Sequence, residues 1–247
     1  RRDFLVRGVR GRAALASLFL REWRLMNREP VYFMNGPMII FLMPVIIAFG
    51  LLVTSRNQEA MRDLGPLLEE WRGQGWPMLI TAALGAFLGS STSITCTALS
   101  RDAKALRYLK ALPLRYRDFM LAKFLHGFAF AALGTLVAVA GGAIGFRLSL
   151  LDAAGAALIS LAFSALACIG GLWLDTANPK LAWDTPISAM KQNPNAVIAI
   201  LAVMAVLAAL GIASAFIPWG KAALFTLYFG AFAALSAAAL AAYPRYA

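Results

Sequence analysis

LSRDAKALRYLKALPLRYRDFMLAK, residues 99–123, decides the fold class of this chain, because it is a basic segment between two apolar runs that are each long enough to cross a bilayer. The segment holds seven Lys or Arg residues and two acids. Positive charge between two spans is held at one face of the membrane. We therefore expect a membrane protein with a docking element at that face.

The composition agrees with this interpretation, since 61% of the residues are hydrophobic and 14% are charged. Windows of about 20 apolar residues occur at 31–53, 76–98, 124–146, 150–174, 196–216 and 222–242. They predict an all-α membrane protein with six transmembrane helices. We divide the chain into an amphipathic segment, 1–30, and a six-helix domain, 31–247. Because residue 1 is Arg, this domain could be one half of a longer chain.

The distribution of basic residues predicts the orientation. The two termini and the connections 99–123 and 175–195 share one side in a six-span layout and hold 18 Lys or Arg residues, against five on the other side. Cytoplasmic connections carry such an excess, so we expect both termini in the cytoplasm. These charges flank the spans and form no single basic surface, and nucleic acid is not an expected partner.

The first thirty residues predict an interfacial amphipathic helix that ends before Pro30. Its apolar face holds Leu15, Leu18, Phe19, Trp23 and Met26. Its other face holds Arg10, Arg21, Arg24 and Arg28, and Glu22 is the exception on the apolar face. We expect this helix to lie among lipid headgroups, with arginines toward phosphates. Whether it is a plain anchor or takes part in coupling stays open.

Two loops on the cytoplasmic side carry helix signals. In the first, Ser100 can cap a helix over 101–111 that Pro113 ends, with Arg101, Lys104 and Tyr108 on its charged face. In the second, 174–195, Thr185 can cap a helix over 186–192 that Pro194 stops. Two ordered elements on one face predict a docking surface, although the positive-inside tendency alone also makes such loops basic.

The second predicted span ends in a run of hydroxyl side chains. Within it, Ser91, Thr92 and Thr95 could line a translocation path, while the alternative is tight packing of helices through small residues. Gly85 and Gly89 in this span, and Gly141 and Gly145 in the third, have the spacing of packing glycines.

Enzyme and metal-site patterns are absent from the sequence. It contains no G-x-x-x-x-G-K-[ST], H-E-x-x-H, G-x-S-x-G or C-x-x-C motif. The single histidine, His126, and the two cysteines, Cys96 and Cys168, are predicted to be packing residues. Ionisable residues are nearly absent from the spans, which disfavours a proton-driven pump. Energy for uphill transport would have to come from a partner.

The two cytoplasmic loops resemble those of permease subunits of ATP-binding-cassette exporters of the type 2 class, in a group of bacterial exporters. The resemblance rests on Ser100-Arg101-Asp102, on Leu109-Lys110-Ala111-Leu112-Pro113, and on Leu174-Asp175, Pro179-Lys180-Leu181, Trp183 and Lys191-Gln192-Asn193. These patches cover about a fifth of the chain, and the six-span layout extends the likeness.

The resemblance implies a coupling helix between spans 2 and 3 that docks on a separate nucleotide-binding subunit, which binds ATP and Mg²⁺ and hydrolyses the ATP. No cofactor is expected in this chain. The implied contact residues are Ser100, Arg101, Asp102, Lys110, Leu112 and Pro113, with Lys180, Trp183, Lys191, Gln192 and Asn193 in the neighbouring loop. A second permease half, membrane lipids and the bacterial inner membrane are implied as partners and location. The alternative is a membrane scaffold or sensor subunit that docks a partner and transports nothing.

Overall fold

The structure, a computed structural model, describes residues 14–56, 66, 70, 75–216 and 220–242, which contain helices and no strand. The chain forms α2 (Ala14–Arg28), α3 (Pro30–Asn35), α4 (Met38–Ser55) and α6 (Trp76–Ser90). The short helices α7 (Ala98–Arg101) and α8 (Leu106–Ala111) follow. The remaining helices are α9 (Tyr116–Gly145), α10 (Leu150–Ala177), α11 (Pro186–Met190), α12 (Pro194–Phe216) and α13 (Lys221–Ala242).

Four helices in the described part of the chain, α9, α10, α12 and α13, are long enough and apolar enough to cross a membrane. The predicted all-α class is confirmed, and six spans are not. Helix α4 has 18 residues, Met38–Ser55, with Pro44 in its interior, and at 1.5 Å per residue it reaches about 27 Å. Helix α6 has 15 residues, and at 1.5 Å per residue it reaches about 22 Å, less than the ~30 Å of a hydrocarbon core.

The prediction of one continuous helix over 76–98 is wrong beyond Ser90, because the hydroxyl-rich residues that follow bond to their own backbone. Ser93 has a φ of 53°, in the left-handed region that helices exclude. The Thr97 hydroxyl donates to the Ser93 carbonyl at 2.7 Å. Side-chain bonds of this kind compete with the helical hydrogen-bond ladder. The chain is therefore irregular from Ser91 to Thr97 before α7 begins.

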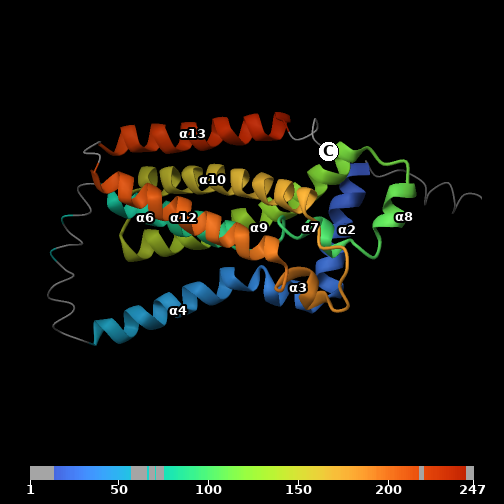
Figure 1. The fold of residues 1–247 in the computed structure, drawn as a ribbon. Coiled ribbons are helices and arrows are strands. Elements are labelled where there is room, and N and C mark those ends of the chain that lie inside the picture. Colours follow the sequence, from blue (N-terminus) through green and yellow to red (C-terminus); the bar gives the residue numbers. More distant parts are fainter. Residues whose placement is uncertain (1–13, 57–65, 67–69, 71–74, 217–219, 243–247) are drawn as a thin grey trace, which may run out of the picture.

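Helices α6, α9 and α10 pack against one another, and α13 covers α10, while α4 diverges from the bundle (Figure 1). Close approach of α6 and α9 depends on glycine. A Cβ atom at Gly134 would lie 2.9 Å from the Gly89 amide nitrogen. The packing role predicted for Gly89 is thus confirmed. In the described part of the chain, a Cβ at Gly141 or Gly145 meets no neighbour within 4 Å, so neither packs against another described helix, and Gly142 packs on Thr81 instead.

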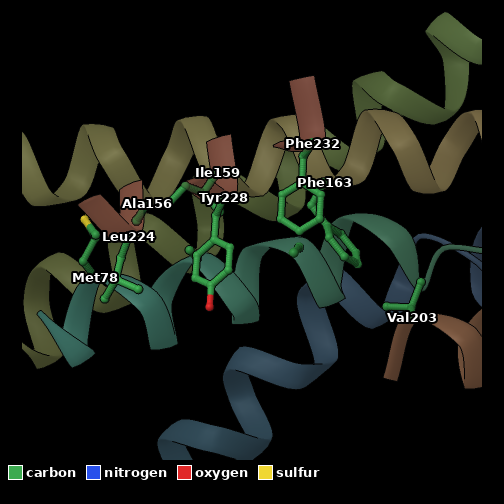
Figure 2. Close-up of a cluster of buried hydrophobic side chains, with 10 residues drawn as sticks. Met78, Ala156, Ile159, Phe163, Val203, Leu224, Tyr228 and Phe232 are labelled. Carbon is green, nitrogen blue, oxygen red and sulfur yellow. The ribbon is translucent and has the colours of Figure 1, made fainter. Parts of the chain in front are cut away.

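The main apolar core joins α6, α10, α12 and α13 (Figure 2). Its labelled members are Met78, Ala156, Ile159, Phe163, Val203, Leu224, Tyr228 and Phe232. Tyr228 brings a polar atom into this core, and its hydroxyl shares a hydrogen bond with the Ser214 hydroxyl at 2.5 Å. The polar tip is thereby satisfied, as a buried tyrosine requires.

One end of the bundle carries most of the polar structure. Helix α2 crosses this end, and α3, α7, α8, α11 and the last turn of α13 gather there (Figure 1). Leu18 of α2 packs with Phe119 and Met120 of α9, and Met26 packs with Phe130. The predicted burial of this apolar face in lipid is therefore wrong, because protein covers it. Pro30 begins α3 directly after α2, as expected from the helix stop.

Candidate functional site

The first polar loop forms two short helices where one helix over 101–111 was predicted. Helix α7 ends at Arg101, turns follow, and α8 runs from Leu106 to Ala111. Ser100 therefore caps nothing, and the cap position of α8 is Ala105, which makes no side-chain cap bond. The predicted stop is right: Leu112 is extended and Pro113 follows.

Asp175, near the end of α10, joins this loop to the bundle. One carboxylate oxygen accepts from the Leu99 and Ser100 amides at 2.6 and 3.1 Å. The other accepts from the Ser100 hydroxyl and from Asn195 Nδ2 at 3.0 Å. Asp175 is fully buried, and these bonds replace the water that a buried carboxylate loses. The first loop, α10 and the start of α12 are therefore tied at one group.

The second polar loop lies against the first. The Lys180 amide donates to the Ser100 hydroxyl at 2.9 Å, and Trp183 Nε1 donates to the Ser100 carbonyl at 2.7 Å. The Lys104 ammonium lies 4.3 Å from the centroid of the Trp183 ring, within cation–π range. The Lys180 ammonium donates to carbonyl oxygens further along its own loop. The two loops thus form one connected surface.

Four charged side chains form a buried network beneath this surface. Lys123 of α9 contacts Asp102 Oδ2 at 2.5 Å and Glu22 Oε1 at 3.1 Å. Arg21 of α2 contacts the same two acids, at 2.5 Å for Asp102 and 2.8 Å for Glu22. The Lys123, Asp102 and Glu22 side chains are at most 2% exposed. Helix α2, the first loop and α9 are therefore joined by ion pairs in the protein interior.

Electrostatics favour the charged form of this network. Burial disfavours the Asp102 carboxylate, but Lys123 and Arg21 outweigh burial, so the pKa of Asp102 lies below its usual value. For Arg21, burial acts to lower the pKa. The hydrogen bond to Asp102 and the nearby carboxylates outweigh burial and raise this pKa above its ordinary value. The network explains why Glu22 interrupts the apolar face of α2.

Three residues predicted to dock a partner are buried and serve the protein interior. Ser100 is fully buried and Asp102 belongs to the ion network. Arg101 is 4% exposed and donates to the Ile94 carbonyl at 2.9 Å. Its guanidinium also lies 5.6 Å from the Tyr32 ring centroid. Arg101 thus supports the irregular segment that follows α6, and its predicted place on an exposed charged face is wrong.

The exposed part of the first loop is α8 and the residues after it. Tyr108 is 71% exposed and Leu112 is 37% exposed. Lys110 and Pro113 are exposed as well. Figure 1 shows α8 beyond α2 at the polar end of the bundle. Of the six residues predicted for this contact, Lys110, Leu112 and Pro113 are accessible to a partner.

The second loop shows a similar division. Lys191 and Gln192 are exposed, while Lys180 and Trp183 are partly buried. Asn193 is fully buried and accepts a hydrogen bond from the Asn195 amide at 3.0 Å. Asn193 is therefore a loop-shaping residue.

The arginines of α2 differ in their surroundings. Arg21 points into the ion network, whereas Arg24 and Arg28 are exposed. Arg10 lies outside the described residues. Arg21 is thus not free to contact lipid phosphates as predicted, while that prediction stays open for Arg24 and Arg28.

The predicted path residues have different surroundings. Thr95 fills the space beside Gly127 and Gly171, and the Thr92 carbonyl lies 2.7 Å from where a Gly36 Cβ would be. Both residues therefore serve close packing. Ser91 instead borders a cavity between α4 and α12.

His126 and the cysteines have packing environments. His126 is fully buried, with its ring centroid 5.3 Å from that of Trp23 and 5.4 Å from that of Phe130. Cys96 and Cys168 are buried free thiols. Among the described residues, no cluster of three His, Cys, Asp or Glu side chains could hold a metal ion.

Sequence reasoning assigned no role to Asp175 or Asn195, although both contribute to the polar end. An acid at the end of a predicted span was the available signal. Comparison of the chain with models of protein families, with curated proteins and with solved structures finds no match. The assignment of function therefore depends on the geometry of the polar end.

Proposed function

We propose that this protein is the membrane-spanning permease subunit of an ATP-binding-cassette exporter of the type 2 class, in the inner membrane of a bacterium. One observation carries the proposal. The exposed helix α8 projects from the bundle, and the loop that holds it is anchored to α2, α9 and α10 by buried polar groups. A helix that transmits movement from a partner needs such rigid attachment.

The partner in this proposal is a nucleotide-binding subunit that carries the ATP and Mg²⁺ sites. Its contact with the permease uses Tyr108, Lys110 and Leu112, an aromatic, a charged and an aliphatic side chain on one exposed element. Exposed aromatic residues surrounded by polar ones are typical of protein interfaces. A second permease half completes the transporter, and both termini face the cytoplasm.

Copurification with a candidate ATP-binding-cassette ATPase subunit tests the docking. Lys110→Glu is expected to weaken the association at least tenfold, since it reverses a charge on the exposed helix. Arg147→Glu is the matched control, because it makes the same charge change at an exposed residue of the α9–α10 connection, at the other end of the bundle. Equal association of both variants with the ATPase would refute the role of α8.

Transport decides between a permease and a scaffold. In sealed vesicles that contain both subunits, the permease is expected to support ATP-dependent movement of a lipid or other amphipathic probe. A scaffold or sensor subunit would associate with the ATPase in the same experiment and give no flux.

A further inference from the structure

A cavity of about 330 Å³ lies between the turn joining α3 to α4 and the beginning of α12. Its volume falls at the lower end of the range of small-molecule sites. Met38, Ile39 and Leu42 of α4 form one wall, and Val197 and Ile200 of α12 form the other. Both helical walls of the cavity are therefore apolar.

The polar part of the cavity lining has unused hydrogen-bonding capacity. Ser91 and Ser93 border the cavity and are 5% and 7% exposed. Within the described part of the chain, the Ser91 hydroxyl is buried without a hydrogen-bond partner. An unpartnered buried polar group is unfavourable, and a hydrogen bond from a ligand atom or a water relieves that cost.

Lys191 supplies positive charge to the same lining. It is exposed and lies in the turn between α11 and α12. Two other loop lysines are engaged: Lys180 bonds to carbonyl oxygens and Lys104 lies over Trp183. Among the described residues, no hydrogen bond or ion pair is found for the Lys191 ammonium. This cation is therefore available to a ligand.

The surroundings of the cavity favour entry from lipid. Val45 and Ile46 of α4 are 64% and 52% exposed, and Leu201 and Met204 of α12 are 59% and 51% exposed. Exposed apolar surface beside a cavity is suited to hydrocarbon and not to water. A ligand reaching the cavity this way carries an apolar chain, and the free cation selects a negatively charged headgroup.

We propose that this cavity binds an anionic membrane lipid, with an acyl chain between α4 and α12 and the headgroup on Lys191. We further propose that such anionic amphiphiles are the substrate class of the exporter, a step that rests on the proposed function. Lys191 then belongs to the lipid site and not to the docking surface for the ATPase.

A second groove provides a matched control. It lies between α9, α10 and α13, has a volume of about 260 Å³, and Arg117 is the charged residue in its lining. Met120, Phe124 and Leu240 contribute apolar surface there. Because the described lining of this groove has no other polar side chain, a lipid headgroup bound there would contact Arg117 alone among polar groups.

Photolabelling in vesicles tests the lipid site. The whole protein is reconstituted in phosphatidylcholine vesicles that contain a few per cent of phosphatidylglycerol with a photoreactive acyl chain, and labelled residues are mapped by mass spectrometry. We expect labels on α4 and α12 at the cavity. Lys191→Gln should reduce them about tenfold, while Lys191→Arg and Arg117→Gln should leave them unchanged.

Two further arms make the result decisive. Photoreactive phosphatidylcholine, which has no net charge, should label the cavity about tenfold less than phosphatidylglycerol. Ile200→Trp should block labelling by filling the space of the chain. Equal labelling by both lipids, equal labelling of Lys191→Gln and wild type, or labels confined to the Arg117 groove would overturn the proposal. The experiment contains no ATPase, so its failure leaves the docking result unaffected.

Discussion

Replacement of Lys123 by Met tests the buried ion network most directly. The Lys123 ammonium lies 2.5 Å from Asp102, 3.1 Å from Glu22 and 3.0 Å from the Ala98 carbonyl, and its side chain is 1% exposed. Met has a similar length and no charge, so Lys123→Met leaves two buried carboxylates with Arg21 as their common cation. Removing one partner of a buried ion pair costs about 3–5 kcal/mol.

This loss should be visible as a fall in melting temperature. For a chain of this size, 1 kcal/mol corresponds to about 2–4 °C, so Lys123→Met should melt about 6–20 °C lower. Cys96 and Cys168 are buried free thiols, and a thiol-reactive dye that fluoresces on reaction reports their exposure during heating in detergent. The native thiols thus supply the signal without further substitution.

Lys221→Met is the matched control, since the Lys221–Asp152 contact is 3.3 Å and the two side chains are 40% and 20% exposed. Solvent screens such a pair, and its loss should cost at most about 1 kcal/mol. Adding Glu22→Gln and Asp102→Asn to Lys123→Met should restore much of the lost stability. Equal melting temperatures for Lys123→Met and Lys221→Met would refute a stabilising role of the network.

Two further predictions concern packing and topology. Gly134→Val should lower the melting temperature by several degrees, because a Cβ there meets the Gly89 backbone and overpacking costs about 1–3 kcal/mol. Gly141→Val, where the added Cβ meets no described residue within 4 Å, should have little effect, and equal losses would contradict the close helix contact. A cysteine at Tyr108 should resist an impermeant thiol reagent in intact cells, and one at Arg147 should react. The reverse pattern would invert the predicted orientation.

The long helices could be predicted from the sequence, because hydropathy and helix length are local properties. The predicted spans 150–174 and 222–242 differ by few residues from α10 and α13. The end of α6 could not be predicted in this way. A hydropathy window tolerates Ser and Thr, whereas the irregular backbone at Ser93 depends on side-chain-to-backbone hydrogen bonds such as that from Thr97, which a hydropathy average does not register.

The errors in the first loop share one cause. Assigning Arg101 and Lys104 to one exposed face assumed a single helix from 101 to 111. The chain turns between Arg101 and Leu106, which sends Arg101 inward to Ile94. The sequence also gives no indication of the partners of Asp175, because Ser100 lies 75 residues away from it. Local periodicity carries no information on such pairs.

The distribution of buried polar contacts and sparsely packed helices indicates how the proposed transporter would move. A force on α8 would pass through Asp102 to α2 and α9, and through Ser100 to Asp175 of α10, because buried charges and hydrogen bonds resist separation. Most side chains of α12 are exposed, and α4 diverges from the bundle. Displacing α4 therefore breaks few interactions, whereas α12 is held at its first turn by the bond from Asn195 to Asp175 and at its last turn by the Ser214–Tyr228 bond. Since the cavity beside Lys191 lies between α4 and α12, a movement driven at α8 that displaces α4 would change that cavity while the polar contacts of α12 stay intact.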